Sequence, residues 1–128
     1  NSINLENKIC GIVGIGRIIG LPISLWLIQQ KVTVFIVDVQ TKNPEEIIRN
    51  CDIVIGGAGQ AHLINKNWIK PKAIVIDFGF EIIDNKICGD VDFDDVKEKV
   101  NLITPTPGGT GPILVAMLFQ NLKKLIQK

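Results

Sequence analysis

Three glycines near the start of the chain could bind the phosphates of a dinucleotide. Gly14, Gly16 and Gly20 follow a predicted strand and open a predicted helix, at relative positions one, three and seven rather than the common one, three and six. Glycine permits a tight turn, lets backbone approach a pyrophosphate and lets a helix pack closely on a strand, while the helix N-terminus offers N–H groups and a positive dipole. A tight turn in an α/β domain that binds nothing is the alternative.

An acidic residue and further glycines follow the next predicted strands. Asp38 lies 24 residues after Gly14, where a carboxylate in such folds accepts hydrogen bonds from an adenosine ribose; a solvated aspartate at a strand end is an equal alternative. Residues 56–59 (Gly-Gly-Ala-Gly) follow the third strand and Gly79 follows the fourth. Ligands bind at the carboxyl edge of open parallel sheets, although ordinary turns also use glycine. We therefore predict a cofactor cleft at this edge.

The stretch from residue 104 to residue 112 holds three prolines and three glycines in nine residues, between a predicted strand and a predicted helix. Proline stiffens the backbone, and glycine lets a flat ligand approach it. These residues predict a shaped binding loop. A plain linker is the alternative, which the following apolar helix makes less favourable.

Groups that could transfer protons are not evident in the sequence. His62 is the only histidine, and no Cys or acid pairs with it at helical spacing, so we expect a surface or loop residue. No Ser-His-Asp set, zinc signature or phosphate-binding-loop lysine can be assembled, so neither a catalytic residue nor a metal site is predicted. Trp26 and Trp68 are expected in the core.

The elements that must position these residues alternate along the chain. Five short runs rich in β-branched residues, apolar on both faces, predict buried parallel strands at residues 9–13, 32–37, 53–55, 73–76 and 101–103. Helices are predicted over residues 20–30, 43–50, 92–99 and 112–127, and a hairpin over residues 81–88. The predicted fold class is α/β: a Rossmann-like, doubly wound, mainly parallel sheet flanked by helices, in a single domain over residues 1–128.

Two of these helices carry specific expectations. Asn43 is predicted to cap the second helix, with Pro44 at its first position and two acids near the positive end of its dipole. The last helix carries one apolar stripe made of Val115, Leu118, Leu122 and Leu125.

Composition restricts the class of protein. The chain has 128 residues, of which 46% are hydrophobic and 21% charged, and a formal net charge of +1. These values fit one globular domain and argue against a nucleic-acid binder that works through phosphate contacts. The chain lacks an apolar run of membrane-spanning length, and its three cysteines sit among apolar neighbours as buried reduced thiols would. We expect a cytoplasmic protein without membrane contact, with a mitochondrial location as the alternative. The start of the chain, close to its first strand, suggests that an upstream segment is missing.

Several longer motifs carry a resemblance to a known family. From Ile3 to about Leu122 the chain resembles the C-terminal, dinucleotide-binding half of the bifunctional methylenetetrahydrofolate dehydrogenase/cyclohydrolase family. The most specific motif is residues 103–112 (Ile-Thr-Pro-Thr-Pro-Gly-Gly-Thr-Gly-Pro), with Val-Ala-Met-Leu beyond it at 115–118. Gly-Asp-Val-Asp-Phe at 89–93, Ile-Lys-Pro at 69–71, Val-Ile-Asp-Phe-Gly at 75–79 and Gly-Leu-Pro at 20–22 add to it.

The resemblance implies an activity, and it implies which domain of the family carries the catalytic residues. Family members oxidise 5,10-methylenetetrahydrofolate with NAD or NADP and hydrolyse the methenyl product, within the one-carbon metabolism that supplies purine biosynthesis. The catalytic lysine and its tyrosine neighbour belong to an N-terminal domain that this chain lacks, so the chain alone is expected to be inactive and to meet folate only together with that domain. Full-length members are expected to be homodimers. Without its partner domain, the stripe on the last helix is expected to be exposed and to drive self-association.

The resemblance and the residue patterns together give the candidate sites. The expected cofactor-binding residues are Gly14, Ile15, Gly16, Asp38, Val39, Gly59 and Phe80. The expected folate-side loop consists of Pro107, Gly108, Gly109, Thr110, Gly111 and Pro112.

Departures from the family pattern bear on the choice of cofactor. The family has Arg-Ser at Ile15 and Gly16, His-Ser at Asp38 and Val39, and threonine at Leu114. Because phosphate donors are lost and a carboxylate is gained, NAD is expected to be preferred, with NADP possible. Two alternatives stay open: a non-catalytic binding or interaction module derived from the family, and a fragment of another Rossmann dehydrogenase.

Overall fold

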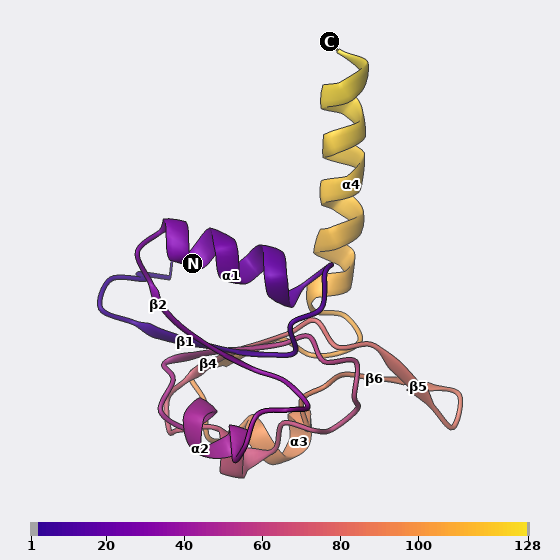
Figure 1. Ribbon diagram of the computed structural model, residues 1–128. Helices are drawn as coiled ribbons and strands as arrows, with labels where there is room; N and C mark the ends of the chain where they lie inside the picture. The colour runs from indigo at the N-terminus through magenta and orange to yellow at the C-terminus, as the bar shows by residue number, and fades with distance from the viewer. Residues whose placement is uncertain (1–2, 128) are drawn as a thin grey trace.

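The computed structural model describes residues 3–127, which form an α/β fold around a parallel sheet. Within these residues the sheet has five strands in the order β2-β1-β3-β4-β7. Figure 1 shows helix α1 on one face of the sheet and helices α2 and α3 on the other, so the chain is doubly wound. The strands are β1 (Ile9–Val13), β2 (Thr33–Val37), β3 (Ile53–Gly56), β4 (Ile74–Asp77) and β7 (Leu102–Ile103). The other elements are α1 (Gly20–Gln29), α2 (Pro44–Ile48), the 3-10 helix η1 (Lys66–Trp68), the hairpin β5 (Glu81–Ile83) and β6 (Lys86–Cys88), α3 (Phe93–Val96) and α4 (Thr110–Ile126).

The register of the sheet brings the carboxyl ends of four strands to one edge. Val13 lies opposite Val37 on one side and Gly56 on the other, and Gly56 lies opposite Asp77. Because parallel strands end at the same edge, the segments that begin at residues 14, 38, 57 and 78 leave the sheet side by side. This alignment places the glycine turns and Asp38 near one another.

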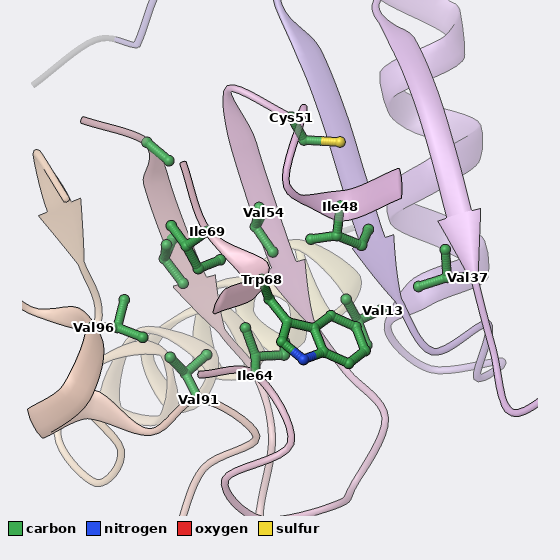
Figure 2. Packing of buried hydrophobic residues seen from close by; sticks show 12 residues of the cluster. Val13, Val37, Ile48, Cys51, Val54, Ile64, Trp68, Ile69, Val91 and Val96 are labelled. Carbon is green, nitrogen blue, oxygen red and sulfur yellow. The ribbon is translucent and has the colours of Figure 1, made fainter. Parts of the chain in front are cut away.

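Two apolar clusters hold the sheet between its helices. One lies on the side of α2 and includes Ile48, Val54 and Trp68, which are all buried. Figure 2 shows the Trp68 ring in this cluster beside Ile64 and Val13. The second lies on the side of α1 and includes Ile12 and Leu27, among others. Strands β1 and β3 are therefore buried on both faces, as the sequence predicts. The prediction of a buried strand is wrong for β2, where Phe35 and Ile36 are exposed because this strand lies at the edge of the sheet.

The predicted elements are confirmed, with ends that differ by a few residues. The five strands fall within one residue of their predicted limits, and the hairpin forms as predicted. Asn43, however, does not cap α2 with its side chain, so that prediction is wrong. Its φ of 50° is left-handed, whereas a capping residue normally has an extended backbone that aims its side chain at the first turn. Asp92 does cap α3, accepting a hydrogen bond of 3.2 Å from the Asp95 N–H.

The two tryptophans have different environments. Trp68 is 8% exposed and belongs to the core as predicted, but Trp26 is 52% exposed, so its prediction is wrong. Helix α1 buries only Gly20, Ser24 and Leu27, a stripe with spacings of four and three residues. Trp26 is not part of this stripe.

The cysteines are also of two kinds. Cys10 and Cys51 are buried, and burial raises the pKa of the Cys10 thiol to about 12 and that of Cys51 to about 11. Such thiols are chemically inert near neutral pH. Cys88 on β6 is partly exposed, which corrects the prediction that all three thiols are buried.

Helix α4 differs from the other helices because it rises away from the sheet (Figure 1). It has 17 residues, and none of them is buried. It begins at Thr110, two residues before the predicted start. Leu118, Leu122 and Leu125 are 59%, 51% and 70% exposed, so the predicted exposed stripe is confirmed. Between residues 3 and 127 no helix combines the length and apolar character needed to cross a membrane.

Candidate functional site

The first glycine turn is shaped by close contacts with the loop that follows β3. Gly14 has a φ of 94° and donates its N–H to the Val37 carbonyl oxygen over 2.8 Å. A Cβ atom at Gly14 would lie 2.7 Å from both the Ala58 Cα and the Gly57 carbonyl oxygen. Residue 14 must therefore be glycine for conformational and steric reasons.

Gly20 explains the unusual spacing of this turn. A Cβ atom there would overlap the carbonyl oxygen of Gly14, because the first turn of α1 packs directly on the turn. Gly16 has no such restriction, since the nearest atom to a Cβ at this position is the Gly57 oxygen at 3.9 Å. The first and third glycines thus bring the start of α1 close to the end of β1, and Gly16 keeps its surface open to a ligand.

A cleft of about 570 Å³ opens at the carboxyl ends of β1 and β2. Five of the seven predicted cofactor residues line it: Gly14, Ile15, Gly16, Asp38 and Val39. Gly57 and Ala58, from the glycine-rich segment that the sequence places at this edge, also line it. Further lining residues were not singled out for this role from the sequence: Thr41, Pro44, Gln60, Leu63 and Trp68. We call this the dinucleotide cleft.

Asp38 presents its carboxylate at the mouth of the dinucleotide cleft. Its Oδ1 accepts hydrogen bonds from the Gln40 N–H at 2.9 Å and the Thr41 hydroxyl at 3.2 Å. The Asp38 N–H in turn donates to the Thr41 hydroxyl oxygen at 2.9 Å. These local bonds fix the direction of an exposed carboxylate that can accept from two neighbouring hydroxyl groups.

A second, largely apolar cleft of about 510 Å³ lies between the segment after β4 and the loop before α4. Phe80 lines this cleft, and so do all six residues of the predicted folate-side loop. Phe80 is thus separated from the other predicted cofactor residues, and Gly59 lines neither cleft. The two clefts have lining residues in contact with each other: a Cβ atom at Gly57, in the dinucleotide cleft, would lie 2.8 Å from the side chain of Ile19, in the second cleft.

The loop of residues 104–109 is held at both ends by the last residue of β4. The Asp77 N–H donates to the Thr104 hydroxyl oxygen at 2.8 Å, and the Thr110 hydroxyl donates to the Asp77 carbonyl oxygen at 2.9 Å. The Thr106–Pro107 peptide bond is cis. The loop is therefore held in place, and helix α4 starts directly after it. Its role in binding stays a prediction.

Asp77 itself is a buried acid that sequence reasoning missed. Its carboxylate accepts hydrogen bonds from the N–H groups of Gly79 at 2.7 Å, Asp90 at 3.2 Å and Val91 at 3.1 Å. Burial raises the pKa of Asp77, the nearby Asp90 acts in the same direction, and the three N–H donors oppose them. An acid at the end of an apolar strand, followed by glycine two residues later, was the available signal.

His62 lies at the surface, as expected, with a φ of 57°, and lines neither cleft. Its N–H donates to the Gly89 carbonyl oxygen at 3.0 Å. Its place in the fold is that of a loop residue.

Comparison with known proteins identifies the family. The protein-family model for the NAD(P)-binding domain of tetrahydrofolate dehydrogenase/cyclohydrolase matches residues 1–128. The chain belongs to this family. The resemblance drawn from the sequence motifs is therefore confirmed, and the chain is the NAD(P)-binding domain.

Curated members of the tetrahydrofolate dehydrogenase/cyclohydrolase family match along nearly the whole chain. Bifunctional protein FolD 2 of Arabidopsis thaliana is 44% identical over 94% of the chain, and bifunctional protein FolD of Lactobacillus helveticus is 41% identical over 98%. These matches cover 43% and 45% of the two relatives. The chain thus spans less than half the length of the relatives it matches.

Solved structures of the family have the same fold. The bifunctional FolD enzyme of Campylobacter jejuni superposes with a TM-score of 0.88 at 38% identity, over 91% of this chain and 42% of that one. The Trypanosoma brucei enzyme, solved with NADP and an inhibitor, gives 0.88 at 34% identity over 98% and 47%. D-2-hydroxyisocaproate dehydrogenase reaches 0.58 at 19% identity and shares the fold alone. The predicted Rossmann-like fold class is confirmed.

Proposed function

We propose that the protein containing this chain oxidises 5,10-methylenetetrahydrofolate with a dinucleotide and hydrolyses the methenyl product, and that this chain binds the dinucleotide. The observation that carries the proposal is the dinucleotide cleft, where a glycine turn, a helix N-terminus and an exposed carboxylate meet at the carboxyl edge of the sheet. The bifunctional names of the FolD relatives, and the NADP in the Trypanosoma brucei structure, support it.

The residues of the cleft fit such a cofactor. Gly16 and the first turn of α1 would face the pyrophosphate, because backbone there is accessible and the helix dipole is positive. Asp38 would accept from the adenosine ribose, with Val39 beside it. When bound, the dinucleotide supplies a hydride acceptor. Ile19 and Gly57 would guide its other end toward the second cleft, where Phe80 and the loop from Pro107 to Pro112 would meet the folate.

We place the proton-transfer groups in the part of the protein outside this chain. Among residues 3–127, neither cleft is lined by a lysine, tyrosine or histidine, and acid–base catalysis needs a group within reach of the reacting atoms. The 128-residue chain alone should therefore bind dinucleotide but turn over neither folate substrate. Steady-state assays with both substrates test this, and rates near those of a full-length relative would contradict it.

We also propose that NAD is preferred to NADP. The side chains of Ile15 and Val39 offer no donor to a 2′-phosphate, and the Asp38 carboxylate would repel its charge of about −1.5 to −2. Losing one charge-assisted contact costs about 1.5–3 kcal/mol, so NAD should bind at least about tenfold more tightly. Arg17 and Lys42 are the cations nearby in sequence that would have to reach the phosphate to reverse this preference.

Calorimetric titration of wild-type protein and two variants with both cofactors tests this preference. Asp38→Asn removes the negative charge of the side chain and should narrow the difference in affinity between NAD and NADP. Asp84→Asn makes the same charge change at the exposed tip of the β5–β6 hairpin, where φ is 49° and asparagine is well tolerated, and should leave it unchanged. Equal or tighter NADP binding by wild type would refute the role of Asp38. No binding of either cofactor would favour a non-catalytic module instead.

The complete protein is proposed to be a homodimer, as the resemblance implies. Exposed apolar side chains on α1 and on the edge strand β2, among them Leu25, Trp26 and Phe35, support an interface on this domain. Sedimentation of the complete protein would test it, and a monomer at micromolar concentration would contradict it.

A further inference from the structure

The loop between β3 and η1 is held by a carboxylate that belongs to neither cleft. The carboxylate of Asp90 accepts hydrogen bonds from three successive N–H groups: Ala58 at 2.5 Å, Gly59 at 3.1 Å and Gln60 at 2.8 Å. Asp90 is fully buried. Successive N–H groups that converge on one point form a cradle for an anion, and here the anion is a side chain of the protein itself.

This loop forms one wall of the dinucleotide cleft. Gly57, Ala58 and Gln60 line the cleft together with Gly14 and Asp38. The loop also sets the position of the glycine turn, because a Cβ atom at Gly14 would lie 2.7 Å from the Gly57 oxygen and 2.8 Å from the Ala58 nitrogen. A shift of the loop by one ångström would therefore change the width of the cleft.

Asp90 is itself fixed from the opposite side. Its N–H donates to Asp77 Oδ1 at 3.2 Å, and its carbonyl oxygen accepts from the Ile64 N–H at 2.9 Å. Glu81 adds a further carboxylate to the loop, accepting from the Ala61 N–H at 2.7 Å. A rigid chain of contacts thus runs from the end of β4 through Asp90 to the wall of the cleft.

We propose that Asp90 is a positioning residue for dinucleotide binding: its carboxylate keeps residues 57–60 in the conformation that completes the cleft, without touching the cofactor. The inference rests on the proposed function of the cleft. If the binding-competent conformation of a released loop were populated one time in ten, the apparent affinity would fall tenfold. The affinity for NAD and NADP should then depend on a residue that the ligand does not reach.

The test uses Asp90→Asn in the complete protein that contains this chain. Asparagine keeps the size of the side chain but replaces one acceptor oxygen with an NH₂ group, which cannot accept from the loop N–H groups. We expect the KM for the dinucleotide to rise at least about tenfold, with kcat at saturating dinucleotide within about twofold. Hydrolysis of the methenyl compound consumes no dinucleotide and should keep its rate. Hydrogen exchange should accelerate at the amides of residues 58–60 and stay slow in β1 and β3.

Asp92→Asn is the matched control. It makes the same substitution two residues away, where the carboxylate caps α3 through the Asp95 N–H and does not touch the loop. It should lower thermal stability slightly and leave the KM for dinucleotide unchanged. A similar rise in KM in both variants would overturn the proposal.

Other outcomes separate the two proposals. If wild-type protein binds no dinucleotide, the proposed function fails, whereas wild-type binding with an unchanged KM in Asp90→Asn overturns only the role of Asp90. If Asp90→Asn lost the dehydrogenase and the hydrolysis activity in parallel, the substitution would have damaged the fold in general, and this result would also overturn the proposed role of Asp90. Should Asp90→Asn not fold, Glu81→Gln weakens the same loop at Ala61 from a partly exposed position and should raise the KM about two- to threefold; no change would overturn the proposal.

Discussion

Helix α1, which covers the sheet, and helix α4 both carry apolar residues at helical spacing, yet they differ in burial. Helix α1 buries Gly20, Ser24 and Leu27 against the sheet, and α2 buries Ile48. Helix α4 is longer than either and places several leucines along one side, but buries none of its residues. An apolar stripe therefore predicts that a helix forms and which face is apolar, while burial depends on whether another element lies opposite.

The largest expected effect on the stability of the folded chain comes from adding one carbon atom at the start of helix α1. Gly20→Ala should destabilise the chain by more than about 4 kcal/mol, because its Cβ would overlap the backbone of Gly14, which cannot move aside as a flexible side chain could. Gly111→Ala makes the same change at the start of α4, where nothing lies within 4 Å, and should be neutral or stabilising by up to about 1 kcal/mol. Urea unfolding of the 128-residue chain, followed by circular dichroism, measures both. Similar midpoints for the two variants would contradict the comparison.

Shortening a side chain in the core should cause the next largest loss of stability. Ile48→Ala removes a fully buried side chain from the cluster around Trp68 and should cost about 2–5 kcal/mol. Ile126→Ala makes the same substitution on α4 at a side chain that is 75% exposed, and should change stability by less than about 0.5 kcal/mol. The same unfolding experiment compares them. A cost above 1 kcal/mol at Ile126 would show that α4 packs against something in solution.

An ion pair at the base of the sheet should have a smaller effect that depends on pH. Asp52 Oδ1 lies 2.7 Å from Lys70 Nζ, and its Oδ2 accepts from the Ile9 N–H at 2.8 Å. The hydrogen bond from Lys70, and then that from Ile9, hold the pKa of Asp52 below its ordinary value of 3.8. The charged form is thus favoured in the folded chain. Its stabilisation is complete above pH 3.8 and is lost as pH falls through the lower folded pKa.

Asp52→Asn should therefore destabilise the chain by about 1–2 kcal/mol at pH 7, and the difference from wild type should shrink below about pH 4. Asp94→Asn breaks an ion pair with Lys97 in which the Asp94 side chain is 85% exposed, and should not move the unfolding midpoint measurably. Thermal melts between pH 3 and pH 8 give both comparisons. A difference between wild type and Asp52→Asn that grows on acidification would contradict the assigned direction.

The smallest effect on folding, but a visible one on association, is expected at the exposed stripe of α4. The isolated chain should self-associate through Leu118 and Leu122, and replacing both with lysine should make it monomeric with little change in stability. Lysines at Gln120 and Asn121 add the same charge to the same helix beside the stripe and serve as the control. Sedimentation at increasing concentration measures the difference. A wild-type chain that stays monomeric would refute the expectation.

Much of the fold and part of the site could be predicted because the relevant signals are local. β-branched runs, glycine turns and a proline in the first turn of a helix restrict the backbone within a few residues, whatever the rest of the chain does. Gly14, Gly16 and Asp38 were accessible to this reasoning because parallel strands bring their ends to one edge. Other lining residues of the cleft were not accessible, because Gln60 and Trp68 reach it through the pairing of distant segments.

The sequence by itself determined the order of strands and helices, the glycine-rich edge and the family. Only the tertiary structure decided which side chains and backbone groups come together at that edge of the sheet. It separated Phe80 from the dinucleotide cleft, left Trp26 at the surface, and brought the buried carboxylate of Asp90 to N–H groups thirty residues earlier in the chain. The physical reason is that propensity and periodicity act over one or two turns, whereas burial and hydrogen bonding depend on which surfaces the folded chain places opposite one another.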